Sequence, residues 1–547
     1  MMFLLAGQPL CAALAALEPL PPVVECSSLT GAQLSEAVGA KVDIEAATVV
    51  QDGRPKPYCK VTGVIAPAIR FEVRLPVANW TQRFVQTGCG GLCGNLNVNL
   101  NRTEGCVPAT NGEVVLASTD MGHSNTGGAN GEPEWAVKNP QAQMDFAYRG
   151  VHLTTLASKE LIRKYYGRKP RYSYFSGCSD GGREALMEAQ RYPGDFDGIA
   201  AGAPAMNFIT QNTFYHGWNA RVNTSAEGKP VLTSDKLPVL HQAVLAACDE
   251  LDGRKDGILA FPPACHFDPA TIICKPGQDA ATCLTPAQAS AAKEIYRGAH
   301  SASGEQFVIS GPQYGSELAW EGVFVPRGSG TQTISAGMAL GTMRYMAYPN
   351  PLATSWTLND FQFDAATFDA VKPRHRIYDA TDPNLSRFEA AGGKLLIWHG
   401  WSDPHISPLN SIAYMDAMRK TMGATKVAGF SRLFLFPGGY HCNGGEGPFD
   451  FQLTNILMNW VESGTAPDSI IARKANSPVT RPVYAYPKVA RYKGTGDPDS
   501  ADSYTGAPGP PLAPAALNWR GAPFYTPGYE QWCEWNGSAM ACSDKAR

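Results

Sequence analysis

The residues with the clearest chemical potential lie in one short run, Gly177-Cys178-Ser179-Asp180-Gly181. An aromatic, β-prone run at 172–175 leads into it, and a helix-prone run at 183–190 follows. Gly-x-Ser-x-Gly between a strand and a helix is typical of a nucleophile elbow, which exposes a serine hydroxyl on a tight turn. Glycines are required there because larger neighbours would collide across the turn. We therefore predict that Ser179 is a catalytic nucleophile and not part of a merely structural turn.

A serine hydroxyl needs a general base, and the base needs an acidic residue to orient it. In α/β-hydrolases these partners follow the serine in the order acid, then histidine, at the ends of later strands. The apolar run 395–398 is followed by His-Gly-Trp-Ser-Asp, which ends at Asp403. The apolar run 433–436 is followed by Pro-Gly-Gly-Tyr-His, which ends at His441. Asp403 and His441 are therefore predicted to be the acid and the base.

Competing interpretations exist for both residues. Asp403 precedes a proline and could belong to an Asp-Pro turn, and His441 could be a surface loop histidine. His123, His399 and His405 are rival bases. His123 precedes the nucleophile in the chain, whereas His399 lies too close to a strand end that already supplies the acid.

Fourteen cysteines are the most informative part of the composition. Cys178 precedes the serine and Cys442 follows the histidine, so a disulfide between them would hold nucleophile and base together. Cys93–Cys106 is the one bond expected among Cys89, Cys93 and Cys106, and Cys11 is left unassigned. Tight Cys/His clusters that would indicate zinc are lacking, so disulfides and a secreted or periplasmic location are predicted. The other expected pairs are Cys26–Cys59, Cys248–Cys265, Cys274–Cys283 and Cys533–Cys542.

The length and charge limit the remaining possibilities. A chain of 547 residues is long for one domain, so a core with a large insertion is expected. The net charge of −3 gives no electrostatic reason to expect nucleic acid or an anionic membrane as a partner. After the N-terminus, no apolar stretch reaches the length of a membrane span.

Strand-like and helix-like segments alternate before position 205 and after position 381, which predicts a mostly parallel sheet with helices on both faces. The predicted class is α/β, an α/β-hydrolase fold with a large inserted lid domain. Residues 1–24 resemble the remnant of a signal peptide but lack its basic region. The predicted parts are this leader (1–24), the first part of the core (25–205), the lid (206–380), the second part of the core (381–490) and a Pro/Gly-rich tail with a terminal disulfide (491–547).

Two loops could bind ligand atoms. The backbone N–H groups of Asp180 and of the glycine-rich loop at Gly90 and Gly91 are predicted to form an oxyanion hole; a flexible glycine hairpin is the alternative. In the lid, Asp249, Asp252 and Asp256 lie among glycines in an oxygen-rich loop suited to Ca²⁺. An acidic surface loop without a metal is the alternative there.

Three motifs together resemble the tannase/feruloyl esterase family: Gly177 to Glu184, His399 to Asp403 and Gly439 to Cys442. The resemblance extends from about Cys26 to Lys493, and the family includes mono(2-hydroxyethyl) terephthalate hydrolases. It implies an α/β-hydrolase core, a large lid and a disulfide that joins the two triad segments. It also implies a structural Ca²⁺, with the backbone carbonyls of Arg254 and Ile258 adding to the three aspartates.

The predicted activity is that of a secreted serine carboxylic ester hydrolase, cleaving small aromatic or phenolic acid esters through an acyl-enzyme. A terephthalate monoester hydrolase is the alternative enzyme, and a catalytically silent binding protein on a hydrolase scaffold is the alternative of another class. The resemblance makes Arg344 a candidate for binding a free carboxylate, with a surface salt bridge as its alternative role. Tyr348 and Trp401 are further candidates for substrate contact, whereas most lid aromatics are expected to be lid core. The sequence does not indicate the oligomeric state.

Overall fold

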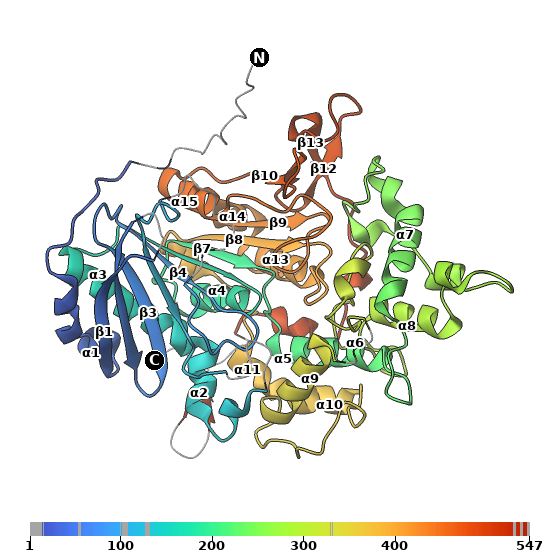
Figure 1. Cartoon of the computed structure of the whole chain (residues 1–547), viewed down its shortest axis with the longest axis horizontal. Coiled ribbons are helices and arrows are strands. Elements are labelled where there is room, and N and C mark those ends of the chain that lie inside the picture. Colours follow the sequence, from blue (N-terminus) through green and yellow to red (C-terminus); the bar gives the residue numbers. More distant parts are fainter. Residues whose placement is uncertain are drawn as a thin grey trace.

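The computed structural model describes residues 14, 16–52, 56–98, 100, 108–125, 132–328, 330, 332–528, 532–535 and 540–543 (Figure 1). Most of the predicted leader, residues 1–13 and 15, lies outside these ranges, as do Cys11 and Cys106. Within them, no helix is both long and apolar enough to cross a membrane.

A nine-stranded sheet lies at the centre of the molecule, in the order β1-β2-β3-β5-β4-β6-β7-β8-β9. Strands β1 to β3 and the β3–β5 pair are antiparallel, and every pair from β5 to β9 in this order is parallel. The predicted α/β class with a mostly parallel sheet is confirmed. The strands are β1 (Val42–Val50), β2 (Tyr58–Ile65), β3 (Ile69–Pro76), β4 (Arg83–Thr87), β5 (Val115–Thr119), β6 (Tyr172–Cys178), β7 (Gly198–Gly202), β8 (Lys394–Gly400) and β9 (Ser431–Phe436).

Helices cover both faces of the sheet, as β8 illustrates. Leu395 and Ile397 belong to the larger core cluster, together with residues of α3, α4 and α13. Leu396 and Trp398 belong to a second cluster, together with residues of α15. Because successive strand side chains point to opposite faces, a strand buried on both sides must be apolar throughout. The helices are α3 (Gly150–Tyr166), α4 (Asp180–Arg191), α13 (Leu409–Met422), α14 (Ala424–Phe430) and α15 (Leu453–Ser463).

A long segment is inserted between β7 and β8, residues 203–393, and much of it lies beside the sheet (Figure 1, green to yellow). It contributes no strand to the nine-stranded sheet and has an apolar cluster of its own, around Leu240, Trp320 and Phe324. The residues of the predicted lid, 206–380, all fall within it. Its main helical elements are α5 (Phe208–Thr210), the π-helical η4 (Gln211–Tyr215), α6 (His216–Val222), α7 (Leu237–Cys248), α8 (Pro286–Arg297), α9 (Ile334–Tyr345), α10 (Ala365–Val371) and α11 (His375–Tyr378).

The C-terminal residues return to the core, although their Pro/Gly-rich composition gave no indication of it. Phe524 stacks on His375 with ring centroids 3.5 Å apart. The Tyr525 hydroxyl accepts a hydrogen bond from Asn207 Nδ2 at 2.6 Å. The last strand pair places Cys533 opposite Cys542, and Cys542 is disulfide-bonded. The strand pairs here are β10 (Ser469–Arg473) with β11 (Thr480–Tyr484), β12 (Lys488–Tyr492) with β13 (Tyr504–Pro508), and β14 (Trp532–Trp535) with β15 (Met540–Ser543).

Five disulfides join pairs of cysteines whose side chains are both described, and one of them corrects a prediction. Cys93 is bonded to Cys89, not to Cys106. Gly91 and Cys93 adopt positive φ values of 62° and 57°, which folds the loop back and brings the two cysteine Cα atoms to 5.4 Å. The sequence separation alone did not reveal this turn. The other four are Cys26–Cys59, Cys178–Cys442, Cys248–Cys265 and Cys274–Cys283, each as expected.

Candidate active site

Ser179 lies on a strained turn between β6 and α4. Its backbone has φ 67° and ψ −120°, a conformation that a residue with a side chain seldom adopts and that is often found at active sites. A Cβ on Gly177 would lie 2.3 Å from Gly181 O, and one on Gly181 would lie 2.8 Å from Cys89 O. Both glycines are therefore required by close backbone contacts, and the local structure is the predicted strand, turn and helix.

Asp403 and His441 are brought together from the ends of β8 and β9. His441 Nδ1 lies 2.7 Å from Asp403 Oδ2. The Asp403 side chain is fully buried and that of His441 is 17% exposed. Ser179 and His441 line the same cavity, so the three predicted triad residues converge on one site.

Asp403 is surrounded by hydrogen-bond donors. Its Oδ1 accepts the backbone N–H groups of His405 and Ile406 at 2.8 and 3.0 Å, and His399 Nε2 lies 3.1 Å from its Oδ2. Burial alone would raise the pKa of Asp403, but His441 and His399 beside it hold that pKa well below its usual value. A carboxylate that stays ionised can fix the histidine tautomer and stabilise an imidazolium.

The rival histidines have other surroundings. His399 is fully buried, with Nδ1 2.8 Å from Ser411 Oγ, so it supports Asp403 from behind. His123 Nε2 lies 2.8 Å from Leu92 O, and burial lowers the pKa of His123 to about 4. His405 does line the cavity, with its ring centroid 4.7 Å from that of His441, but Asp403 contacts its backbone and not its ring.

The Cys178–Cys442 disulfide joins the neighbours of Ser179 and His441. Its Cα atoms are 5.9 Å apart, across a sequence separation of 264 residues. The bond therefore connects the turn after β6 directly to the loop after β9. In the chain-entropy model, closing so long a loop stabilises the fold by on the order of 5 kcal/mol.

We expect a Cys178→Ala/Cys442→Ala double variant to lose about a hundredfold in kcat with little change in KM. Small misplacements of reacting groups reduce rates by about this factor, whereas the rest of the cavity is intact. Steady-state kinetics on a soluble aromatic ester measures both constants. The matched control is Cys274→Ala/Cys283→Ala, which removes a disulfide of the inserted segment that spans only 9 residues. An equal kcat loss in the control would contradict the positioning role.

The loop that contains Gly90 and Gly91 lies against the start of α4. Gly181 N–H donates to Cys89 O at 2.7 Å, and the Cys89–Cys93 disulfide closes the loop around the two glycines. Asp180 is the first residue of α4, so its N–H has no partner within the helix. Gly90, Gly91 and Asp180 all line the cavity, where two such N–H groups could bind an oxyanion.

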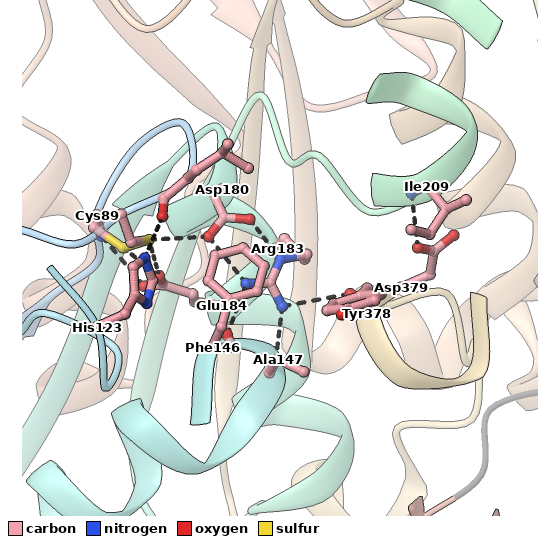
Figure 2. Close-up of polar contacts among 12 residues, drawn as sticks. Cys89, His123, Phe146, Ala147, Asp180, Arg183, Glu184, Ile209, Tyr378 and Asp379 are labelled. Atoms are coloured by element: carbon pink, nitrogen blue, oxygen red, sulfur yellow. Dashed lines mark hydrogen bonds and ion pairs between the residues drawn. A yellow bond between two sulfur atoms is a disulfide. The ribbon is translucent and has the colours of Figure 1, made fainter. Parts of the chain in front are cut away.

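A buried network of hydrogen bonds and ion pairs lies next to this loop (Figure 2). Asp180 accepts two hydrogen bonds from Arg183, at 2.6 and 2.9 Å, and Arg183 also donates to the Ala147 carbonyl. Burial, and then the neighbouring Asp180, raises the pKa of Glu184 well above its usual value. Glu184 Oε1 lies 2.7 Å from Cys89 Sγ.

The cavity beside Ser179 has a volume of about 350 Å³. Phe208, Ile334 and Met338 give it an apolar wall, and Asn212 and His216 contribute polar groups. Sequence reasoning missed these two polar residues. Their spacing of four residues just after β7 is the one signal in the sequence, and neighbouring polar residues such as Gln211 and Thr213 obscure it.

The three predicted substrate contacts do not line this cavity. Arg344 lies 3.3 Å from Glu132 in an ion pair and donates to the Trp356 carbonyl, so its salt-bridge alternative describes it better. Trp401 is buried and lines a different cavity, where its ring packs against Phe261. Tyr348 packs at the edge of the main core cluster. Aromatic residues occur throughout the insertion, so the sequence does not show which of them line the cavity and which pack in the core.

The acidic loop of the inserted segment is folded around Asp249, which accepts the N–H groups of Gly257 and Ile258 at 3.0 and 3.2 Å. Burial, and then the nearby Asp256 and Asp249, raises the pKa of Asp252 to about 6. Asp256 Oδ1 is buried without a hydrogen-bond partner among the described residues. Buried like charges and an orphaned carboxylate oxygen fit a hard cation such as Ca²⁺.

Two other groups of described side chains bring metal-ligating atoms within 4.8 Å of one another. The first comprises Cys89, Cys93, Asp180 and Glu184, and the second His152, Glu188 and Asp195. The first is a possible metal-binding group only when its disulfide is reduced, because the thiolate is the ligand form of cysteine.

A strained serine elbow on a mostly parallel sheet, with an acid after β8 and a histidine after β9, defines an α/β-hydrolase of the serine esterase class. Residues 49–507 match the family model described as tannase and feruloyl esterase. The chain belongs to the tannase and feruloyl esterase family and is a carboxylic ester hydrolase.

Similar proteins carry several names. A mono(2-hydroxyethyl) terephthalate hydrolase from Piscinibacter sakaiensis is 32% identical over 84% of this chain and 86% of its own. A probable feruloyl esterase B-2 from Neosartorya fischeri is 34% identical over 77% of this chain and 80% of its own. The crystal structure of feruloyl esterase B from Aspergillus oryzae covers 88% of this chain and 99% of its own, with a TM-score of 0.75 and 27% identity.

Proposed function

We propose that this chain hydrolyses esters of aromatic, phenolic acids, as a feruloyl esterase or tannase does, in a secreted or periplasmic setting. The observation that supports it most is the convergence of Ser179 and His441 on one cavity, with Asp403 2.7 Å behind the histidine. The apolar wall of the cavity suits an aromatic ring. The five disulfides are consistent with an oxidising compartment.

In the proposed reaction, Ser179 Oγ attacks the ester carbonyl while His441 Nε2 takes the hydroxyl proton. The tetrahedral oxyanion is bound by the N–H of Asp180 and one of the glycine-loop N–H groups. When the C–O bond breaks, His441 returns the proton to the departing alcohol and an acyl-serine remains. Water, activated by the same histidine, then attacks the acyl carbonyl, which releases the acid and restores the serine.

A terephthalate monoester hydrolase is the second candidate, supported by the 32% identical relative. The residue expected to bind its free carboxylate, Arg344, pairs with Glu132 instead and does not line the cavity. We therefore place this substrate second.

A hydrolysis panel tests the proposal. Methyl ferulate, methyl gallate and mono(2-hydroxyethyl) terephthalate are compared at equal concentration, and active sites are titrated with a serine-reactive phosphonate. We expect turnover of the phenolic esters and stoichiometric labelling of Ser179. Absence of both turnover and labelling would instead favour a binding protein on a hydrolase scaffold.

We also propose that Asp249, Asp252 and Asp256, with the carbonyls of Arg254 and Ile258, hold a structural Ca²⁺. The unpartnered Asp256 Oδ1 supports this assignment. Bound calcium would neutralise the buried carboxylates and fix a loop that Cys248–Cys265 already encloses. This proposed calcium site belongs to the inserted segment and would take no part in the ester chemistry.

Chelation should therefore lower the melting temperature more than the activity at low temperature. A ligand that binds only the native state stabilises it by mass action, by about 2.7 kcal/mol at a hundred times its Kd. Thermal melts with EDTA, and with Ca²⁺ or Mg²⁺ added back, measure the effect, and only Ca²⁺ should restore the curve. An Asp249→Asn variant should respond to neither. Superimposable melts, together with no calcium by elemental analysis, would remove the site.

A further inference from the structure

A set of uncharged polar side chains lines the cavity where the inserted segment meets the sheet. Asn212 lies in η4, and His216 begins α6 about one turn later, so both fall on the same side of a continuous helix. His405 follows Asp403 in the loop after β8. Asn212, His216 and His405, here called the polar cluster, all line the cavity that contains Ser179.

Asn212 has an unused hydrogen-bond donor. Its side chain is 4% exposed, and its Nδ2 has no partner among the described residues. Native proteins rarely leave a buried amide unpaired. Because Asn212 lines the cavity, an acceptor on a bound ligand can satisfy it. The π-helical geometry of η4 is itself rare and occurs frequently at functional sites.

The histidines of the cluster are held in place. His216 Nδ1 lies 2.8 Å from Ser335 Oγ, which connects α6 to α9. Gln211 donates from Nε2 to the His405 carbonyl. The His405 ring centroid lies 5.8 Å from that of His216 and 4.7 Å from that of His441. The cluster is therefore fixed next to the predicted catalytic base.

The charges around the cavity favour a neutral ligand group. Burial lowers the pKa of His216 to about 3 and that of His405 well below its usual value, so both rings are neutral near pH 7. No lysine or arginine is among the described residues that line the cavity, whereas the acidic Asp180 is. A free carboxylate would lose its hydration there without a counter-cation. A phenolic hydroxyl can accept from Asn212 and donate to an imidazole nitrogen.

We propose that Asn212, His216 and His405 recognise the phenolic hydroxyl of the acyl group, and that this chain selects hydroxylated aromatic acid esters over acyl groups with a free carboxylate. Phe208, Ile334 and Met338 supply the apolar wall for the ring. The cavity of about 350 Å³ is large enough for a single-ring acyl group. This inference rests on the ester hydrolase function proposed above.

The wild-type enzyme provides the first test. kcat/KM is measured for methyl ferulate, methyl 3,4-dimethoxycinnamate, methyl cinnamate and mono(2-hydroxyethyl) terephthalate. We expect methyl ferulate to exceed each of the others by about tenfold or more, because a site built to bind a hydroxyl leaves buried groups unpaired when the hydroxyl is absent.

Asn212→Leu provides the second test. It should lower kcat/KM for methyl ferulate by about tenfold and for methyl cinnamate by less than about threefold, so that the preference disappears. Ser335→Ala, which removes the partner of His216, should weaken the preference in the same direction. The matched control is Met338→Leu on the apolar wall, which should change all the esters alike. Thermal melts of each variant exclude misfolding.

The outcomes separate the two proposals. Hydrolysis of methyl cinnamate and the dimethoxy ester as efficiently as methyl ferulate, or a preference for mono(2-hydroxyethyl) terephthalate, overturns the phenol assignment and leaves the esterase intact. Wild-type protein that turns over no ester overturns the proposed function itself. If Asn212→Leu does not fold, the wild-type ranking and Ser335→Ala still decide.

Discussion

Ser179→Ala should reduce ester turnover by about four orders of magnitude or more in kcat, with the fold unchanged. The serine supplies the covalent step, and losses of this size are typical when a triad nucleophile is removed. Its side chain is only half-buried, so the substitution removes little packing. Hydrolysis of p-nitrophenyl acetate at substrate saturation, with active-site titration of the wild type, measures the loss.

Ser173→Ala on the same strand, β6, is the matched control because Ser173 does not line the cavity. It should retain kcat within about threefold. Melting curves of both variants should resemble that of the wild type. Residual activity of Ser179→Ala within tenfold of the parent, with contaminating esterase excluded, would refute the nucleophile assignment.

Asp403→Asn should lower kcat by about 10³- to 10⁴-fold and leave KM nearly unchanged. An amide in place of the carboxylate presents an N–H to His441 Nδ1, which then acts as the acceptor. The proton moves to Nε2, and the nitrogen that must take the serine proton is blocked. The low pKa of Asp403 means that the wild-type carboxylate is ionised over the whole assay range, so this loss should appear at every pH from 6 to 9.

Asp416→Asn is the matched control because Asp416 lies on α13 with 41% of its side chain exposed. It should have nearly wild-type activity. Phosphonate labelling of Ser179 should be slowed in Asp403→Asn to the same extent as turnover, because both need the base. If the variant kept activity within tenfold, a group other than Asp403 would orient His441.

The chemistry could be predicted because it is encoded locally. The elbow at Ser179 is encoded by a motif of adjacent residues. Asp403 and His441 each follow an apolar run, in the chain order that the α/β-hydrolase sheet requires. Their adjacency in space follows from the parallel pairing of β6, β7, β8 and β9. Cys178 and Cys442 could be paired because each is a direct neighbour of a triad residue.

The residues that line the cavity could not be predicted, because the lining depends on how helices far apart in the sequence pack together. Arg344 and Met338 lie on the same helix, α9, yet only Met338 lines the cavity. Helical periodicity shows which residues of a helix lie on one face. It does not show which part of the fold that face packs against. The Cys89–Cys93 bond was missed for a related reason, since it depends on two positive φ angles within a single loop.

The strands β7 and β8 are direct neighbours in the sheet, with Gly202 paired to Trp398, although the whole inserted segment separates them in the chain. The insertion thus leaves the sheet at the carboxyl end of β7 and re-enters it at the start of the neighbouring parallel strand, β8, at the opposite edge. It can lengthen, shorten or be exchanged in evolution without altering the strand register that aligns Ser179, Asp403 and His441. Asn212 and His216 lie on this exchangeable part, so one catalytic sheet can acquire new substrates by recombination at its two junctions.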